Sequence, residues 1–510
     1  MYLYILKTFL NGTIHKAQEV KEMYGDILKI NEKEIRDKIY ACWCGKNIGG
    51  TLGAPYEGKA QLNDIKGFSN KAGEIIPNDD LDLQLAWLCA IEKEGPYDMS
   101  ARKLGEYWID LIPPHWGEYS ICKANMRMGI MPSLSGEINN HWKESNGAWI
   151  RSEIWACMAP GFPQIAIRYA CMDACVDHGM NEGTYAALFT TALESIAFRE
   201  TDVKKIINEA LSYIPEDSRI YKSVKYVIDE YEKGTDWKKV REGLMKMDED
   251  IGTWQAPANV GYVIVGLLYG EGDFKKSLLT AVNCGDDTDC TAATIGSFLG
   301  ILNGTDGLPE DWCRHIGDKI VTVSINGSYT FIPKDLYELT ERVFNMMPVV
   351  LKANRIDTKF VDEKSDFSIC KTYENWTDTA KVLLNRSKYF TDGISFVGGK
   401  CFVEFDREPV IAPNETITGT LSFVKLTDGA QYYQTRVFLP NSEGWSCDVP
   451  KNIYLKHGYL THENELNRYT KLKFSITAGE IVDSIIRIPI EVTAQGRPTV
   501  FYIPIVLQGK

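Results

Sequence analysis

The densest set of chemically active side chains in this chain lies in residues 283–294, which read Asn-Cys-Gly-Asp-Asp-Thr-Asp-Cys-Thr-Ala-Ala-Thr. Asp286, Asp287 and Asp289 stand together there, and a helix-like pattern follows at once. Carboxylates this close repel one another unless positive charge lies among them. Mg²⁺, a hard cation that takes oxygen ligands, would supply that charge. The stretch therefore indicates a cation site, although helix capping would explain one Asp and one Thr.

A second acidic cluster, Asn78-Asp79-Asp80-Leu81-Asp82, precedes another apolar, helix-like run at residues 83–90. Capping alone would also explain this cluster. Two acidic helix starts in one domain favour a shared site, because a two-metal site needs several carboxylates around ions about 3.5–4 Å apart. The hypothesis to test in the structure is that the two clusters meet.

Small residues mark the helices that would have to position these clusters. Ala292, Gly296 and Gly300 form a stripe at a spacing of four residues, which predicts close approach of another helix backbone. Residues 45–58 are also rich in glycine and read as a small-residue helix that ends in a turn. Glu57, at the end of that segment, is either a surface residue or a general base.

Composition excludes some classes of function. The 510 residues carry a net charge of -13, so bulk electrostatics give no reason to expect binding to nucleic acid or to an anionic membrane. The 13 cysteines show no disulfide framework, which favours reduced, buried thiols and a cytoplasmic location. No apolar run is long enough to span a bilayer.

The chain divides into four regions by pattern. Residues 1–31 read as an N-terminal leader, and residues 32–351 as an all-α domain of many helices, in which Leu104, Tyr107, Trp108 and Leu111 share one helix face. Residues 352–384 read as a connector. Residues 385–510 contain short alternating strands separated by turn residues, which predicts a β-sandwich.

The order and content of five segments resemble the ADP-ribosylglycohydrolase family, over about residues 32–350. The specific match is residues 285–293 (Gly-Asp-Asp-Thr-Asp-Cys-Thr-Ala-Ala), similar to the family's late Gly-Asp-Thr-Asp-Thr motif. The others are residues 49–57, similar to its early Gly-rich helix with a glutamate; 78–80, similar to its Thr-Asp-Asp motif; 146–151, similar to its Asn-Gly-x-x-Met-Arg stretch; and 177–178, where Thr-His is frequent.

The resemblance implies an all-α fold, two Mg²⁺ ions (Mn²⁺ in some members) and hydrolysis of the bond between ADP-ribose and an acceptor, in a protein or a small ribosyl compound. Carried over by position, the implied metal ligands are Asn78, Asp79, Asp80, Asp287, Asp289 and Cys290. The implied catalytic residues are Glu57, Asp80 and Asp287. The implied substrate-binding residues are Gly53, Asn146, Gly147 and His178.

Two departures from the family pattern keep other interpretations open. Asn78 stands where a hydroxyl residue is usual, and Cys290, a poor partner for a hard cation, stands where a second Thr is usual. The alternatives are a glycosidase of this fold acting on a different N- or O-glycoside and a catalytically silent ADP-ribose-binding protein. The added β domain is expected to be a structural or dimerisation element, which is compatible with a homodimer, rather than a substrate-binding one.

Overall fold

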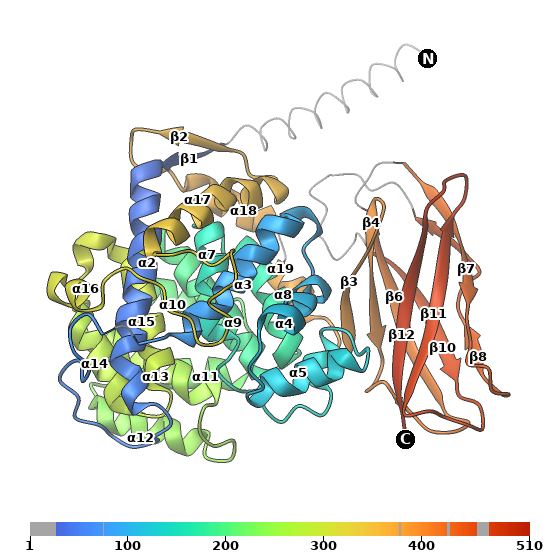
Figure 1. Ribbon diagram of the computed structural model, residues 1–510, viewed down its shortest axis with the longest axis horizontal. Helices are drawn as coiled ribbons and strands as arrows, with labels where there is room; N and C mark the ends of the chain where they lie inside the picture. The colour runs from blue at the N-terminus through green and yellow to red at the C-terminus, as the bar shows by residue number, and fades with distance from the viewer. Residues whose placement is uncertain (1–26, 75, 377–378, 426–428, 456–468) are drawn as a thin grey trace, which may run out of the picture.

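A computed structural model of the protein describes residues 27–74, 76–376, 379–425, 429–455 and 469–510. A helical domain is followed by a β-sandwich, as the sequence predicts (Figure 1). Most of the predicted leader, residues 1–26, lies outside the described residues.

The helical domain comprises helices joined mostly by short loops. Short 3-10 turns also occur, at η1 (Ala54–Tyr56), η2 (Pro96–Asp98), η3 (Trp149–Arg151) and η4 (Thr305–Gly307). The helices are α2 (Glu32–Gly53), α3 (Asp79–Glu94), α4 (Ala101–Leu111), α5 (Gly117–Arg127), α6 (Leu134–Glu137), α7 (Glu153–Met158), α8 (Pro163–His178), α9 (Glu182–Ala197), α10 (Val203–Leu211), α11 (Arg219–Glu232), α12 (Trp237–Met247), α13 (Ala256–Tyr269), α14 (Phe274–Cys284), α15 (Thr288–Asn303), α16 (Glu310–Ile316) and α17 (Leu336–Ala353).

The helix face predicted from hydrophobic spacing is confirmed in α4. Leu104 and Trp108 are fully buried, and Tyr107 and Leu111 are partly buried against the same core. Helices α8 and α9, in contrast, are buried on nearly every side, which agrees with their high content of apolar and small residues.

The tightest contact in the domain is the antiparallel crossing of α2 and α15, which lie side by side in Figure 1. A Cβ added at Gly45, Gly49 or Gly53 would overlap the backbone of α15, and one added at Gly296 or Gly300 would overlap that of α2. The small-residue stripe on α15 therefore meets a matching stripe on α2, and the two backbones touch without intervening side chains.

Two short strands in this region were not predicted. Strand β1 (Leu28–Asn31) pairs in parallel with β2 (Thr358–Val361). Asn31 then caps α2 by accepting a hydrogen bond from the backbone N–H of Glu34. The stretch read as a connector contains β2, α18 (Ser368–Trp376) and α19 (Thr379–Leu384).

The C-terminal region is a sandwich of two five-stranded sheets with the strand orders β3-β4-β6-β10-β8 and β5-β12-β11-β7-β9. Ile486, Ile488, Ile490 and Val492 alternate into the core between the sheets, as predicted. The strands are β3 (Phe390–Phe396), β4 (Gly399–Phe405), β5 (Val410–Ile411), β6 (Thr416–Lys425), β7 (Gln431–Val437), β8 (Ser446–Asp448), β9 (Asn452–Leu455), β10 (Tyr469–Thr477), β11 (Ile485–Ala494) and β12 (Val500–Gly509).

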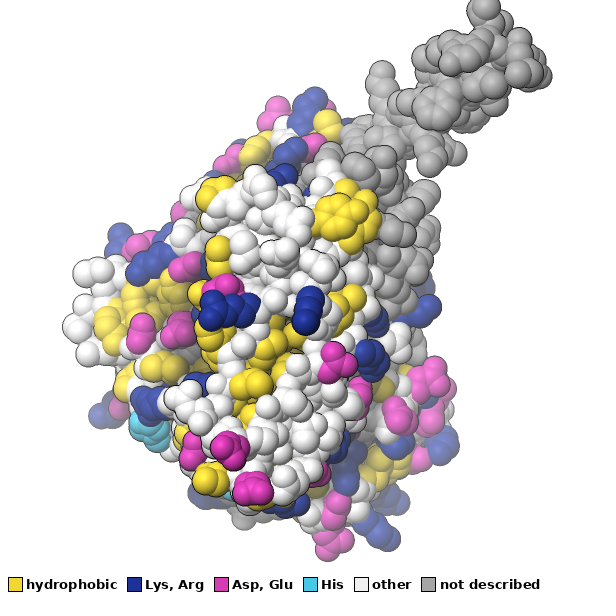
Figure 2. Space-filling model, turned by 90° about the vertical axis from the view of Figure 1, so that its right-hand side faces the viewer, with side chains coloured by type: hydrophobic (Ala, Val, Ile, Leu, Met, Phe, Trp, Pro, Cys, Tyr) yellow, Lys and Arg dark blue, Asp and Glu magenta, His cyan; other side chains and the backbone are white. Residues whose placement is uncertain are grey.

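The sandwich is joined to the helical domain by packing as well as by the chain. Strand β3 lies against α4, and Ser133 beside α6 donates a hydrogen bond to the Phe390 carbonyl at 2.9 Å. Asp392 accepts one from the Ala101 N–H at 3.0 Å. Three residues near α6 are part of the hydrophobic core of the sandwich: Ile130, Leu134 and Ile138. On the side seen in Figure 2, hydrophobic side chains are interspersed with charges of both signs.

All 13 cysteines lie in the described part of the chain, and all but Cys313 and Cys447 are buried. Among the helices of that part, none is both long and apolar enough to cross a bilayer.

The α2–α15 crossing yields a first prediction. We expect Gly296→Ala to destabilise the domain by about 1–3 kcal/mol, because the new methyl group overlaps the Gly45 carbonyl and forces the helices apart. This cost exceeds the roughly 1 kcal/mol that Ala gains over Gly in helix propensity. Thermal unfolding followed by circular dichroism measures the effect. Gly67→Ala, where no atom lies within 4 Å, is the control; equal melting temperatures for the two variants would contradict the prediction.

Candidate active site

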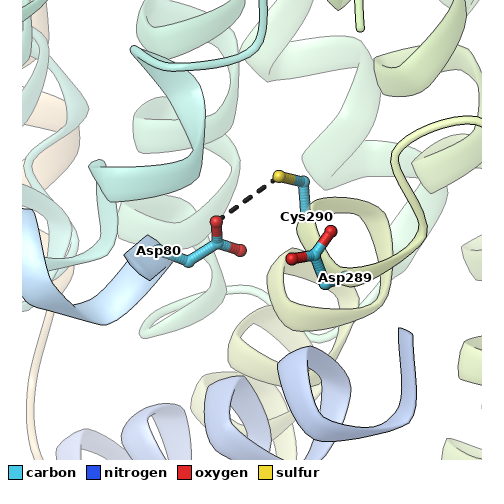
Figure 3. Close-up of side chains that lie close together, drawn as sticks. All are labelled: Asp80, Asp289 and Cys290. Carbon is cyan, nitrogen blue, oxygen red and sulfur yellow. Dashed lines mark hydrogen bonds between the residues drawn. The ribbon is translucent and has the colours of Figure 1, made fainter. Parts of the chain in front are cut away.

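The two acidic helix starts meet in space. The Cys290 thiol at the start of α15 donates a hydrogen bond to Asp80 Oδ1 at the start of α3, at 3.4 Å (Figure 3). One ligand atom from each of Asp80, Asp289 and Cys290 lies within 4.8 Å of the other two, and all three residues are buried. We call this set the inner group.

A second set of carboxylates shares one member with the inner group. Ligand atoms of Glu57, Asp287 and Asp289 also lie within 4.8 Å of one another. Glu57 is exposed, whereas the two aspartates are buried, so this set opens toward solvent; we call it the outer group. Asp289 belongs to both groups, and the site is therefore continuous.

The turn before α15 orients the side chains of Asp287 and Asp289. Gly285 and Asp286 both adopt positive φ, of 80° and 67°. Asp286 uses its carboxylate inside the fold, since Oδ1 accepts from the Trp254 N–H at 2.9 Å and Oδ2 from Asn259 Nδ2 at 3.2 Å. Asp286 is thus a structural residue, and the turn it fixes directs Asp287 and Asp289 into the site.

Three carboxylate oxygens in the site lack a hydrogen-bond donor from the described residues: Asp80 Oδ2, Asp287 Oδ1 and Asp289 Oδ1. Burying a carboxylate oxygen without a donor or a counter-charge is costly. The outer group presents oxygen ligands only and holds two of these atoms. It fits the ligand preference of Mg²⁺.

Burial and mutual repulsion raise the pKa values of the carboxyl groups in the site. Loss of water contact together with the negative charges of Asp289 and Asp79 raises the pKa of Glu57 to about 7. Burial and the charge of Asp289 raise the pKa of Asp79 to about 6. Burial and neighbouring carboxylates also raise the pKa of Asp80 and of Asp287 well above the ordinary value. A cation would replace the protons that this crowding favours.

Two polar residues of the first cluster have structural contacts. Asn78 caps α3 by accepting from the Asp80 N–H at 3.1 Å, and its amide fills the space beside Gly50. Asp82 accepts hydrogen bonds from the N–H groups of Val323 and Ser324, both at 2.6 Å, and so anchors that loop.

Lys46 on α2 is the most consequential residue that sequence reasoning missed. Its side chain is fully buried, and Nζ donates to the Ile150 carbonyl at 2.7 Å and to Glu153 Oε1 at 2.6 Å. It also lies 3.9 Å from Asp80 Oδ2. Burial disfavours the ammonium, but the charges of Glu153 and Asp80 outweigh burial and hold its pKa above the ordinary value. The available signal was one lysine inside a run of small and apolar residues.

The residues expected to bind substrate occupy different surroundings. Asn146 lies in the site, but its Nδ2 donates to Asp287 Oδ2 at 2.6 Å, which orients that carboxylate. Gly53 packs against the backbone of α15, and the space beside Gly147 is filled by the Glu118 carboxylate. His178 is fully buried, with Nε2 3.1 Å from Ser145 Oγ. Of the four, only Asn146 forms a hydrogen bond with a member of the outer group in the described structure.

Behind these residues lies a buried ion-pair network that supports the wall of the site. The Arg151 guanidinium donates to Asp173 Oδ1 at 2.9 Å and to Asp177 Oδ1 at 2.7 Å. Arg151 also donates to the Gly147 carbonyl, next to Asn146. Removal of one partner from such a network typically costs 3–5 kcal/mol, so the network fixes the loop that holds Asn146 in place.

Trp254 was also missed, and it lies at the rim of the site. It adopts φ of 58°, which is rare for a bulky residue, and its side chain is 39% exposed. Its N–H donates to Asp286, and its carbonyl accepts from the Asn146 N–H at 3.1 Å. The ring packs over Gly58 and hydrogen-bonds Glu57. Trp254 thus ties together the segments that carry the outer group.

The raised pKa values yield a second prediction. Because folding raises the pKa of Glu57 to about 7 and of Asp79 to about 6, these groups favour the folded metal-free protein at acid pH. That contribution is lost as pH rises through about 6–7. Mg²⁺ needs the deprotonated carboxylates, so we expect it to raise the melting temperature more at about pH 8 than at about pH 5. Sodium chloride at matched ionic strength is the control. An equal Mg²⁺ effect at both pH values would contradict this.

Comparison with known proteins agrees with the geometry over the helical domain. The ADP-ribosylglycohydrolase family model matches residues 31–350. No curated protein matches the chain significantly. Among solved structures, a FixG-related protein from Vibrio parahaemolyticus is 17% identical, with 22% of this chain and 97% of that chain covered at a TM-score of 0.18, too low to carry an argument. Since the family match spans well over half of the 510 residues, this chain belongs to the ADP-ribosylglycohydrolase family.

Proposed function

We propose that the protein is a Mg²⁺-dependent glycohydrolase that cleaves the glycosidic bond of an ADP-ribosylated protein or of a related ADP-ribosyl or ribosyl compound. Family membership supports glycosyl hydrolysis as the class of reaction. The observation that carries the proposal is the outer group, in which Glu57, Asp287 and Asp289 converge at the solvent edge of a buried acidic site. This arrangement combines cation ligands with a carboxyl group that substrate can reach.

Asp287 and Asp289 would hold the ion, with Asp79 close to Asp289. When bound, Mg²⁺ would supply the positive charge that grips sugar hydroxyls and activates the attacking water. The hydrogen bond from Asn146 occupies Oδ2 of Asp287 and leaves Oδ1 without a donor from the described residues. Asn146 therefore acts as a positioning residue, because it fixes which oxygen of Asp287 points at the ion.

Glu57 is the group we assign to proton transfer. Glycosidic cleavage needs a carboxyl group that protonates the leaving atom, and general acids work best with a pKa near the working pH. In the metal-free protein, loss of water contact and the charge of Asp289 raise the pKa of Glu57 to about 7; the larger contribution, loss of water contact, would persist beside a bound ion. The hydrogen bond with Trp254 holds the carboxyl group at the rim, where the leaving group would lie.

The acceptor is best identified by a direct comparison of substrates. We propose incubating the protein with Mg²⁺ and, in parallel, ADP-ribosylated proteins, free ribosides and nucleosides. Release of ADP-ribose from protein supports the proposal, whereas turnover of another glycoside alone supports the alternative of a different glycosidase. Calorimetric binding of ADP-ribose with no turnover in any arm would indicate a silent binding protein and would contradict the proposal.

Asp287 provides the third prediction. We expect Asp287→Asn to lower kcat by about 10³-fold or more, because Asp287 would help to hold the ion whose charge would stabilise the transition state by several kcal/mol. Asp64→Asn, at a side chain that is 85% exposed, should keep wild-type turnover. Circular dichroism spectra of both variants show whether the fold is intact. Wild-type turnover by a folded Asp287→Asn protein would refute the assignment.

A further inference from the structure

We infer that this chain holds a single metal ion, in the outer group, and that Lys46 and Cys290 take the place of a second ion beside Asp80. The inference rests on the proposed metal-dependent function and departs from the two ions that the family resemblance implies. It concerns the residues of the inner and the outer group, which share Asp289.

Both oxygens of Asp80 already face a neighbour. Oδ1 accepts a hydrogen bond from the Cys290 thiol at 3.4 Å (Figure 3). Oδ2 lies 3.9 Å from the Lys46 ammonium. Oδ2 has no hydrogen-bond donor from the described residues, so the nearby positive charge is what compensates it. A cation between Asp80 and Asp289 would have to displace the thiol and approach the ammonium.

Lys46 has no alternative position. Its side chain is fully buried, and the Ile150 carbonyl and Glu153 hold Nζ at 2.7 and 2.6 Å. Glu153 is fixed in turn, since its Oε2 accepts from Gln84 Nε2 at 2.8 Å. The ammonium therefore stays beside Asp80 and repels any second cation placed there.

Cys290 supplies a ligand of the wrong kind for a hard ion. The thiol is buried and donates its proton to Asp80 Oδ1 at 3.4 Å, so it meets the inner group as an S–H donor. Mg²⁺ and Mn²⁺ prefer oxygen, and a neutral thiol offers them little. The inner group is thus left with two carboxylates, one of which, Asp289, it shares.

Among the described residues, the outer group includes neither a thiol nor an ion-paired ammonium group. Its three members are carboxylates, and no lysine or arginine of the described chain forms an ion pair with Glu57, Asp287 or Asp289. Asp287 Oδ1 and Asp289 Oδ1 are buried oxygens without a donor from the described residues, which is an observation independent of the acidic cluster itself. Because the outer group offers carboxylate oxygens alone, we place the single ion there.

The test uses Mn²⁺ alone as the probe on the full-length protein. Bound metal per chain is counted by elemental analysis after gel filtration, and electron paramagnetic resonance separates an isolated Mn²⁺ from a spin-coupled pair. We expect one Mn²⁺ with the spectrum of an isolated ion. Asp287→Asn should weaken binding by more than about 100-fold, whereas Asp80→Asn should weaken it by no more than the roughly 10–100-fold typical of residues outside the ligand shell.

A second set of variants removes the ammonium and replaces the thiol, so that the inner group should bind a metal ion. In Lys46→Met/Cys290→Asp, we expect a second Mn²⁺ and a spin-coupled signal, and Cys290→Asp alone serves if the double variant does not fold. Two coupled ions in the wild-type protein, or equal losses from Asp80→Asn and Asp287→Asn, would overturn the inference and leave the proposed function standing. Absence of bound Mn²⁺ from folded wild-type protein would overturn both.

Discussion

The direct contact between the backbones of α2 and α15 is the constraint on which the site depends. Small residues spaced four apart on both helices let them cross without side chains between them, for example where Gly45 meets Gly296. The antiparallel crossing brings the end of α2, followed by Glu57, to the start of α15, where Asp287 and Asp289 lie. It also buries Lys46 on α2 beside Asp80. A larger residue in either stripe would separate the carboxylates from one another.

Charge balance explains how so many carboxylates tolerate burial. On the inner side, the ammonium of Lys46 lies among Glu153 and Asp80, and the Cys290 thiol donates to Asp80. On the outer side no such cation is supplied by the described chain, and Oδ1 of Asp287 and Oδ1 of Asp289 have no hydrogen-bond donor there. The protein therefore neutralises one half of the site with its own residues and leaves the other half open to a metal ion. Glu57 and Trp254 lie on that open side, where substrate has access.

Much of this arrangement could be predicted from patterns in the sequence. The stripe at Ala292, Gly296 and Gly300 predicted the helix crossing. The two acidic helix starts were expected to meet because both lie in one helical domain and a two-metal site needs several carboxylates. Alternating Ile residues in β11 predicted the sandwich. Lys46 was not predicted because a lysine is rarely fully buried. Its role also depends on Glu153, which lies more than a hundred residues away in the sequence. The role of Trp254 was not predicted because no sequence pattern indicates a left-handed backbone conformation at a tryptophan. The contact of Asn146 with Asp287 depends equally on tertiary structure.

The central claim is that a metal ion binds among Glu57, Asp287 and Asp289. Anomalous diffraction from crystals grown with Mn²⁺ tests it most directly, because the signal locates the ion without reference to activity. We expect one anomalous peak, coordinated by oxygens of Asp287 and Asp289 on the side that faces Glu57, and none between Asp80 and Cys290. A peak between Asp80 and Cys290, or no peak anywhere in the site, would contradict it.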